Sequence, residues 1–118
     1  MKKIILSIFV LLCCTSVQAA FIEGLEDVPI MDGMTQITND NISFGNEESR
    51  LIEAVLIGKS ATFKSIKAFY KNTLPQMGWI FQNSTESTLV FEREEEIIEI
   101  QKEDTNPLKI RITVKSRN

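Results

Sequence analysis

Carboxylates are the side chains of this sequence whose type and spacing could do chemistry. Five glutamates lie close together in the C-terminal half of the chain: Glu92, Glu94, Glu95, Glu96 and Glu99. A carboxylate pair can act as general acid and base in hydrolysis, and a cluster can bind Ca²⁺. Along a strand, however, Glu92, Glu94 and Glu96 would share one face, and such runs usually form a solvated edge that discourages sheet-to-sheet association. A carboxylate-based hydrolase that uses Glu92, Glu96 and Glu99 is therefore the least favoured of three hypotheses.

The other side chains of covalent and metal catalysis are missing. The chain has no histidine, and its only cysteines, Cys13 and Cys14, lie in a leader that we expect to be removed. Histidine triads and imidazole metal sites are therefore excluded, and thiol chemistry is excluded after that removal. The five glycines are scattered and form no phosphate-binding loop. We predict a protein that is not an enzyme and that binds no metal or other cofactor.

Residues 1–19 have the three-part layout of a secretory signal peptide. Two lysines near the start precede Ile4–Cys14, a run of apolar and small residues, and Val17-Gln18-Ala19 offers small residues to signal peptidase. The run is about half of the roughly 20 residues that span a membrane. We therefore expect export and cleavage near Ala19, which would place the protein in the periplasm of a Gram-negative cell. A retained membrane anchor is the alternative.

The charge of the chain excludes nucleic acid as a partner. Without the two lysines of the leader, 11 basic residues stand against 16 acidic ones, a net charge of −5, whereas nucleic-acid binding needs a basic footprint. Residues 59–71 carry four lysines and no acid, and residues 92–104 carry seven acids and two basic residues. Lys64, Lys67 and Lys71 could steer a partner or touch a membrane peripherally. We favour the simpler interpretation that both charged segments solvate faces of the domain.

The segment Phe63–Trp79 has the periodicity of an amphipathic helix that runs into a strand. At 100° per residue, one compact apolar stripe is separate from the lysines. Its members are Phe63, Ile66, Tyr70, Leu74 and Met77. Thr62 is a suitable N-cap, and Pro75 should end the regular helix near Thr73 or Leu74. We expect the stripe, together with Trp79 at the following corner, to form structural core and not a ligand site.

The remaining residues predict an α+β fold. Residues 20–40 are rich in turn formers, and we expect an irregular lead-in with at most a short extended piece. Within the single predicted domain, residues 41–118, residues 50–59 carry apolar groups on both faces, as a partly covered central strand would. The domain contains six expected strands in all. These are residues 41–46, 50–59, 79–82, 88–93, 96–103 and 108–115. We predict an antiparallel sheet of five or six strands, in the order β-β-α-β-β-β-β, with one amphipathic helix on one face.

Several of these residues form a recognisable pattern. Val28-Pro29 and Gly33-Met34 precede a strand with Arg50 and Ala54, and Phe69-Tyr70, Leu74-Pro75, Gly78-Trp79 and Phe91-Glu92-Arg93 follow. Over residues 27–103 this resembles an uncharacterised family of small exported bacterial α+β domains with an FYxxxLPxxGW motif. The motif is also similar to parts of other envelope domains, including those of outer-membrane assembly lipoproteins. The resemblance implies a fold and a compartment but no catalytic residues. The family has glycine in the hairpin after Arg93 where this chain has Glu94-Glu95, so the resemblance does not predict how tight that turn is.

The three hypotheses for function differ in what the domain would bind. The first is a non-enzymatic envelope protein that binds another protein, through a sheet edge or through the apolar lead-in at Val28, Pro29, Met31 and Met34. The second is a small carrier that holds a lipid or other apolar ligand between helix and sheet. The hydrolase is the third. We favour the first hypothesis, with an unidentified envelope protein as partner.

Overall fold

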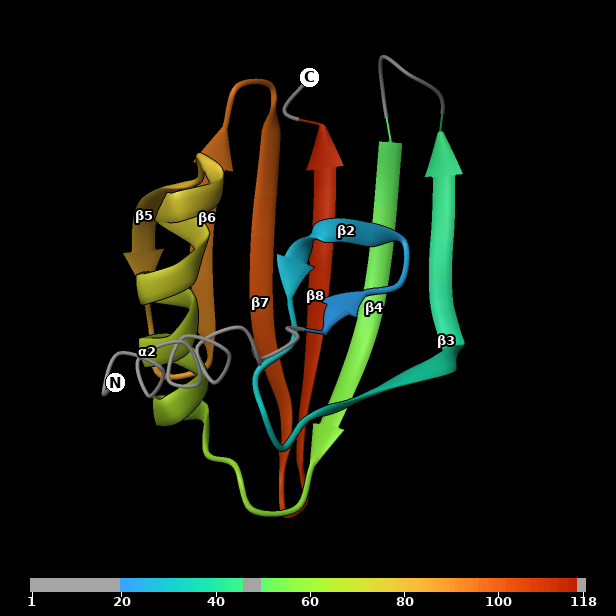
Figure 1. Ribbon diagram of the computed structural model, residues 1–118, viewed down its shortest axis with the longest axis vertical. Coiled ribbons are helices and arrows are strands. Elements are labelled where there is room, and N and C mark those ends of the chain that lie inside the picture. Colours follow the sequence, from blue (N-terminus) through green and yellow to red (C-terminus); the bar gives the residue numbers. More distant parts are fainter. Residues whose placement is uncertain (1–19, 46–49, 117–118) are drawn as a thin grey trace, which may run out of the picture.

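The computed structural model describes residues 20–45 and 50–116 (Figure 1). The expected signal peptide, residues 1–19, lies outside the described residues. The main strands are β3 (Thr35–Gly45), β4 (Arg50–Gly58), β5 (Ile80–Ser84), β6 (Thr88–Arg93), β7 (Glu96–Thr105) and β8 (Leu108–Ser116). They form one antiparallel sheet in the order β3-β4-β8-β7-β6-β5, and the helix α2 (Phe63–Thr73) lies on one face. Over the described residues the predicted α+β class is confirmed, with one α-helix on an antiparallel sheet.

The N-terminal segment is more regular than the sequence predicts. Instead of an irregular lead-in, β1 (Phe21–Ile22) and β2 (Leu25–Pro29) form a separate antiparallel hairpin. Gly24, in the tight connection between them, has a φ of 94°, a conformation that glycine adopts without steric cost. The turn formers of this segment therefore join short strands and do not exclude them. Two strands are added to the predicted count as a result.

The first strand of the main sheet also begins earlier than expected. β3 starts at Thr35, which pairs with Ile57 of β4, and not near residue 41. The register shifts between Ile37 and Ile42. Such an irregularity breaks the two-residue alternation by which a strand is recognised in a sequence, which explains why the first part of β3 was missed.

The helix begins and ends for reasons that the sequence contains. The side chain of Thr62 accepts a hydrogen bond from the backbone N–H of Ser65 at 3.1 Å, and Ser65 Oγ accepts one from the Thr62 N–H at 3.2 Å. This capping box satisfies two N–H groups that have no partner within the helix. Pro75 then lies in a short 3-10 turn, η1 (Leu74–Met77), and Gly78 follows with a φ of 94°.

One core fills the space between the sheet and the elements on its inner face. Figure 1 shows α2 over the β5–β6 side of the sheet and the hairpin beside it, over the β8–β4 side. The hairpin contributes Ile22, Leu25 and Val28, which are at most 1% exposed. The sheet contributes inward-facing side chains such as Ile112, which is fully buried. Within the described part of the chain, no helix has the length and apolar character that crossing a membrane requires.

Candidate binding cleft

The glutamates proposed for chemistry do not all share a face: Glu92 and Glu99 lie on one face of the sheet and Glu96 on the other. Glu94 and Glu95 form the turn between β6 and β7, and the register places Glu92 opposite Ile97 and Arg93 opposite Glu96. Because neighbouring positions along a strand point to opposite faces, Glu92 and Glu96 belong to different faces of the sheet. The expectation of one acidic face is therefore wrong, since the chain reverses in the middle of the acidic run. Among residues 20–45 and 50–116, no three acidic side chains are grouped so that they could hold a metal ion.

The lysines of α2 lie on the side of the helix that borders β5. Lys67 Nζ donates a hydrogen bond to the carbonyl of Thr85 at 3.0 Å and lies 5.7 Å from the centre of the Phe63 ring. Lys71 Nζ lies 5.0 Å from the centre of the Phe81 ring. Lys64 is exposed. Two of the three predicted interaction lysines thus contact their own domain, where cation–π contacts contribute about 0.5–1 kcal/mol each at exposed positions.

An arginine at the end of β6 connects three parts of the fold. Arg93 Nη1 donates to the carbonyl of Met77 at 3.0 Å, and Nη2 lies 2.6 Å from Asp27 Oδ2 of the hairpin. The same Nη2 lies 3.6 Å from Glu96 Oε1, and the guanidinium carbon is 4.2 Å from the centre of the Trp79 ring. A planar guanidinium can pair with carboxylates and stack on an aromatic ring at once. Arg93 therefore fixes the hairpin relative to the corner that follows α2.

A second connection between hairpin and helix is buried. Tyr70 Oη donates a hydrogen bond to the carbonyl of Pro29, the last residue of β2, at 2.7 Å, and Tyr70 is fully buried. Burial raises the pKa of Tyr70 above its ordinary value because the phenolate would lose its hydration. The ring also makes an edge contact with Phe69, with centroids 4.8 Å apart. The hairpin and the helix are thus held side by side at a fixed spacing.

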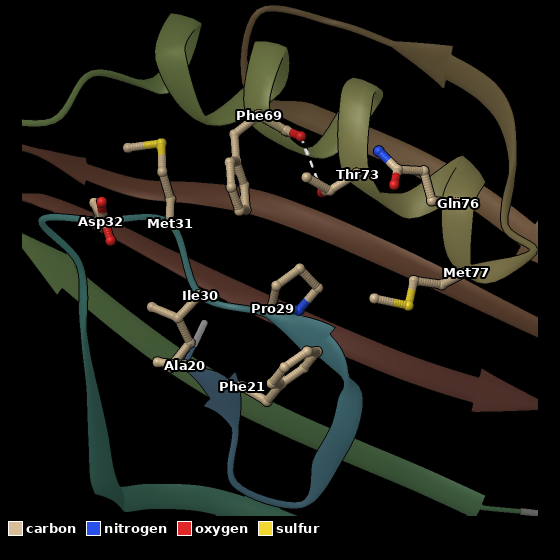
Figure 2. A pocket seen from close by; sticks show the side chains of 10 residues that line it. All are labelled: Ala20, Phe21, Pro29, Ile30, Met31, Asp32, Phe69, Thr73, Gln76 and Met77. Carbon is tan, nitrogen blue, oxygen red and sulfur yellow. Dashed lines mark hydrogen bonds between the residues drawn. The ribbon is translucent and has the colours of Figure 1, made fainter. Parts of the chain in front are cut away.

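The spacing leaves an open cleft between the two elements, with a volume of about 480 Å³. Figure 2 shows its lining residues: Ala20, Phe21, Pro29, Ile30, Met31 and Asp32 from the N-terminal segment, and Phe69, Thr73, Gln76 and Met77 from α2 and η1. Most of them are apolar. Thr73 Oγ1 donates to the Phe69 carbonyl at 2.9 Å, and Gln76 Nε2 donates to the Asn72 carbonyl at 2.9 Å. The polar groups of the helix wall are thus largely occupied within the helix, and the cleft offers mainly apolar surface.

No protein-family model, curated protein or solved structure matches this chain. The resemblance to exported envelope domains stays a prediction. The function must be inferred from the residues of the cleft.

The structure separates the predicted interaction residues into two groups. Pro29 and Met31 line the cleft, whereas Val28 is fully buried and Met34 is 7% exposed. Val28 and Met34 therefore belong to the core and offer no surface to a partner. The sequence assigns them to a binding surface because an irregular lead-in was expected here. That expectation includes neither the strand β2, which buries Val28, nor the turn that directs Met34 into the core.

The predicted core stripe also has one exception. Phe63, Ile66, Tyr70, Leu74 and Trp79 are all buried. Met77 is only partly buried and lines the cleft instead, because the tighter 3-10 turn after Thr73 rotates it away from the helix stripe. Phe21, Ile30 and Phe69 were not predicted for this site. Their apolar character was visible in the sequence, but the contact between residues 20–32 and 69–77 was not.

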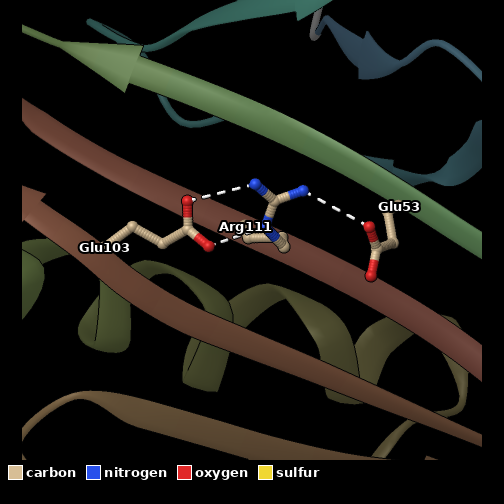
Figure 3. A network of polar contacts seen from close by, with 3 residues as sticks. All are labelled: Glu53, Glu103 and Arg111. Carbon is tan, nitrogen blue, oxygen red and sulfur yellow. Dashed lines mark hydrogen bonds and ion pairs between the residues drawn. The ribbon is translucent and has the colours of Figure 1, made fainter. Parts of the chain in front are cut away.

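A network on the outer face of the sheet is a further cluster of charged side chains (Figure 3). Arg111 Nε lies 2.6 Å from Glu103 Oε2, Nη2 lies 3.2 Å from Glu103 Oε1, and Nη1 lies 3.3 Å from Glu53 Oε1. The hydrogen bonds from Arg111 hold the pKa of Glu103 below its ordinary value. The network joins β4, β8 and β7. Because Arg111 forms ion pairs with both carboxylates, the two glutamates do not form an acid–base pair of their own.

Proposed function

We propose that this chain is a non-enzymatic domain, exported to the cell envelope, that binds another protein through the cleft between the hairpin and α2. The observation that carries the proposal is the apolar lining of an open, concave surface. Phe21 is 40% exposed, and the side chains of Met31, Phe69 and Met77 border the same hollow (Figure 2). Apolar concave surface that remains open to solvent is typical of binding sites.

The rigidity of the cleft supports the same proposal. The Tyr70–Pro29 hydrogen bond fixes one end of the hairpin wall to the helix, and the Arg93–Asp27 ion pair fixes its middle to the end of β6. A site that is already formed before binding loses less conformational entropy when a partner arrives. The two walls can therefore receive a partner without refolding.

The sheet edge at β5 is less suited to the binding of a partner strand. The register of β5 shifts between Phe81 and Asn83, and the Gln82 side chain donates to the Ile80 carbonyl at 3.3 Å. Lys67 and Lys71 of α2 also lie beside this strand. Irregular register, capped carbonyls and nearby lysines are devices that prevent edge pairing. This favours the cleft over the β5 edge as the binding surface.

A small carrier for an apolar ligand is the second candidate. The cleft volume of about 480 Å³ lies within the roughly 300–1,000 Å³ of small-molecule pockets. The ligand would occupy this cleft, because buried side chains such as Ile66, Leu89 and Ile100 fill the space between helix and sheet. Native mass spectrometry of the protein purified from cells would then detect a bound lipid.

Site-specific photo-crosslinking in intact cells tests the proposal. A photoreactive phenylalanine analogue is placed at Met31 or at Gln76, on opposite walls of the cleft, and at Thr113 on the outer face of the sheet as a control. We expect the two cleft positions to crosslink to one discrete protein, and the control position to give no such product. Equal products from all three positions, or none from the cleft, would refute a protein partner at this site.

A further inference from the structure

The apolar surface of the cleft is adaptable. Met31 belongs to the N-terminal wall and Met77 to the end of η1, and Figure 2 shows their side chains on opposite sides of the hollow, with the ring of Phe69 on the helix wall and that of Phe21 below. Thioether chains are unbranched and polarizable, so they adjust to occupants of different shape. Surfaces with several methionines accordingly accept varied bulky side chains of peptides. The lining therefore suits aliphatic or aromatic residues of a polypeptide.

The N-terminal wall of the cleft is acidic. Residues 20–32 contain four acidic residues and no lysine or arginine, and one of the four, Asp27, is paired with Arg93. Asp32 lines the cleft, is exposed, and has no hydrogen bond or ion pair with any residue that the structure describes. Removal of the leader would add one positive charge at Ala20 and would leave two acidic charges in excess in this segment, apart from the paired Asp27. No lysine or arginine lines the cleft.

The sign of this charge selects among apolar occupants. A fatty acid or an anionic phospholipid would bring a negative group toward Asp32, and no lysine or arginine of the lining would pair with it, so that the new amino group of Ala20 would be its one positive partner in the lining. A lysine or arginine next to bulky apolar residues would instead form an ion pair with Asp32 while its neighbours fill the apolar surface. Like charges at an interface disfavour the wrong partner, and opposite charges favour the right one.

We propose that the cleft binds a short segment of its partner protein in which bulky apolar residues stand next to lysine or arginine. This inference rests on the proposed function and specifies the chemistry of the partner. The apolar residues occupy the surface between Met31, Phe69 and Met77, and the basic residue pairs with Asp32.

Two capped hexapeptides test this chemistry, Phe-Leu-Lys-Phe-Leu-Lys and the same peptide with glutamate in place of lysine. The protein is produced from the full chain with its leader, purified after export, and observed through its methionine methyl NMR signals. We expect the lysine peptide to shift the signals of Met31 and Met77 but not that of Met34, which is 7% exposed in the core. We expect the glutamate peptide to bind at least fivefold more weakly, because its charge repels the acidic wall.

A matched pair of variants isolates the role of Asp32. Asp32→Asn should weaken the binding of the lysine peptide about three- to fivefold, which corresponds to the loss of one exposed ion pair. Glu86→Gln, in the exposed turn between β5 and β6, should leave the affinity unchanged. An equal loss in both variants would refute a specific role for Asp32.

The remaining outcomes separate this inference from the proposed function. Equal or tighter binding of the glutamate peptide would overturn the basic-partner inference, whereas a crosslinked protein from Met31 would still support the cleft as an interface. Failure of both peptides together with an absence of crosslinks would overturn both. Shifts of Met31 and Met77 caused by vesicles of phosphatidylglycerol and phosphatidylcholine, in the absence of any peptide effect, would also overturn the peptide inference and indicate a lipid.

Discussion

Replacement of Tyr70 by phenylalanine tests the connection that holds the cleft open. The variant keeps the ring and removes only the hydroxyl that donates to the Pro29 carbonyl at 2.7 Å. Tyr70 and Pro29 are both buried, so the carbonyl would lose its donor in a place that water does not readily reach. Leaving one buried polar group unsatisfied costs about 1–3 kcal/mol. We expect Tyr70→Phe to lower the free energy of unfolding by this amount at neutral pH.

The same substitution should change how stability depends on alkaline pH. Burial raises the pKa of Tyr70 in the folded protein, whereas the unfolded chain ionises near the ordinary value of about 10. Above that pH, the unfolded state has lost a proton that the folded state retains, so stability falls by up to about 1.4 kcal/mol per pH unit. Below pH 10, Tyr70 is protonated in both states, and its full contribution to the free energy of unfolding is present. The difference between wild type and Tyr70→Phe should therefore shrink as the pH rises through the alkaline range.

Urea unfolding monitored by tryptophan fluorescence measures both effects. Thr73→Val is the matched control, because it also removes a hydroxyl that donates to a carbonyl, at 2.9 Å, but in a half-buried position within the helix. The control should change the free energy of unfolding by less than about 0.5 kcal/mol. Tyr70 is the only tyrosine of the chain, so phenolate absorbance reports this residue alone. Destabilisation no larger than that of the control, or a phenol that titrates near its ordinary value while the protein is folded, would refute the reasoning.

Three further substitutions test other parts of the structure. Arg93→Lys should lower the free energy of unfolding by about 1–3 kcal/mol, because an ammonium cannot pair, donate to a carbonyl and stack on an aromatic ring at once; urea unfolding measures this, and a loss below about 0.5 kcal/mol would contradict it. Gly58→Ala should be more destabilising than Gly33→Ala. A Cβ at residue 58 would lie 2.8 Å from the Gly33 carbonyl oxygen and against the sulfur of Met34. A Cβ at residue 33 would have no atom within 4 Å, and the only cost there is the positive φ of 93°. We expect about 2 kcal/mol or more for the first and about 1 kcal/mol for the second, and thermal melts that reverse the order would contradict this. Because the pKa of Glu103 is lowered in the folded protein, the ionised Glu103 stabilises the fold above the ordinary glutamate pKa of about 4.3, and this stabilisation is lost as the pH falls. Arg111→Met should abolish this part of the acid destabilisation. Melting curves of the variant that match those of the wild type across the acid range would disprove it.

The helix and strand β8 were predictable because their residues follow a single period. Tyr70 and Leu74 lie four positions apart and reach the same core, and Thr62 and Pro75 mark the two ends of the helix. In β8, Ile110 and its alternate neighbours face inward without interruption. Local spacing alone determines such elements once one face is buried.

The hairpin and the cleft were not predictable in the same way. β1 contains two residues, too few to display a period, and the register shift after Ile37 conceals the start of β3. Pro29 at the end of β2 reads as a strand breaker, although its carbonyl is the acceptor for Tyr70, 41 positions later. The cleft exists only because such distant contacts bring two apolar segments together, and no local pattern encodes them.

The position of β8 has a consequence for the synthesis of the protein. β8 is the last of the described strands along the chain, yet it lies in the interior of the sheet, between β4 and β7. Before the ribosome has added Leu108–Ser116, β4 and β7 have no neighbour on their inner edges, and the sheet consists of two unconnected pieces. The six-stranded sheet can therefore close only after Leu108–Ser116 has been added, because no earlier segment bridges β4 and β7.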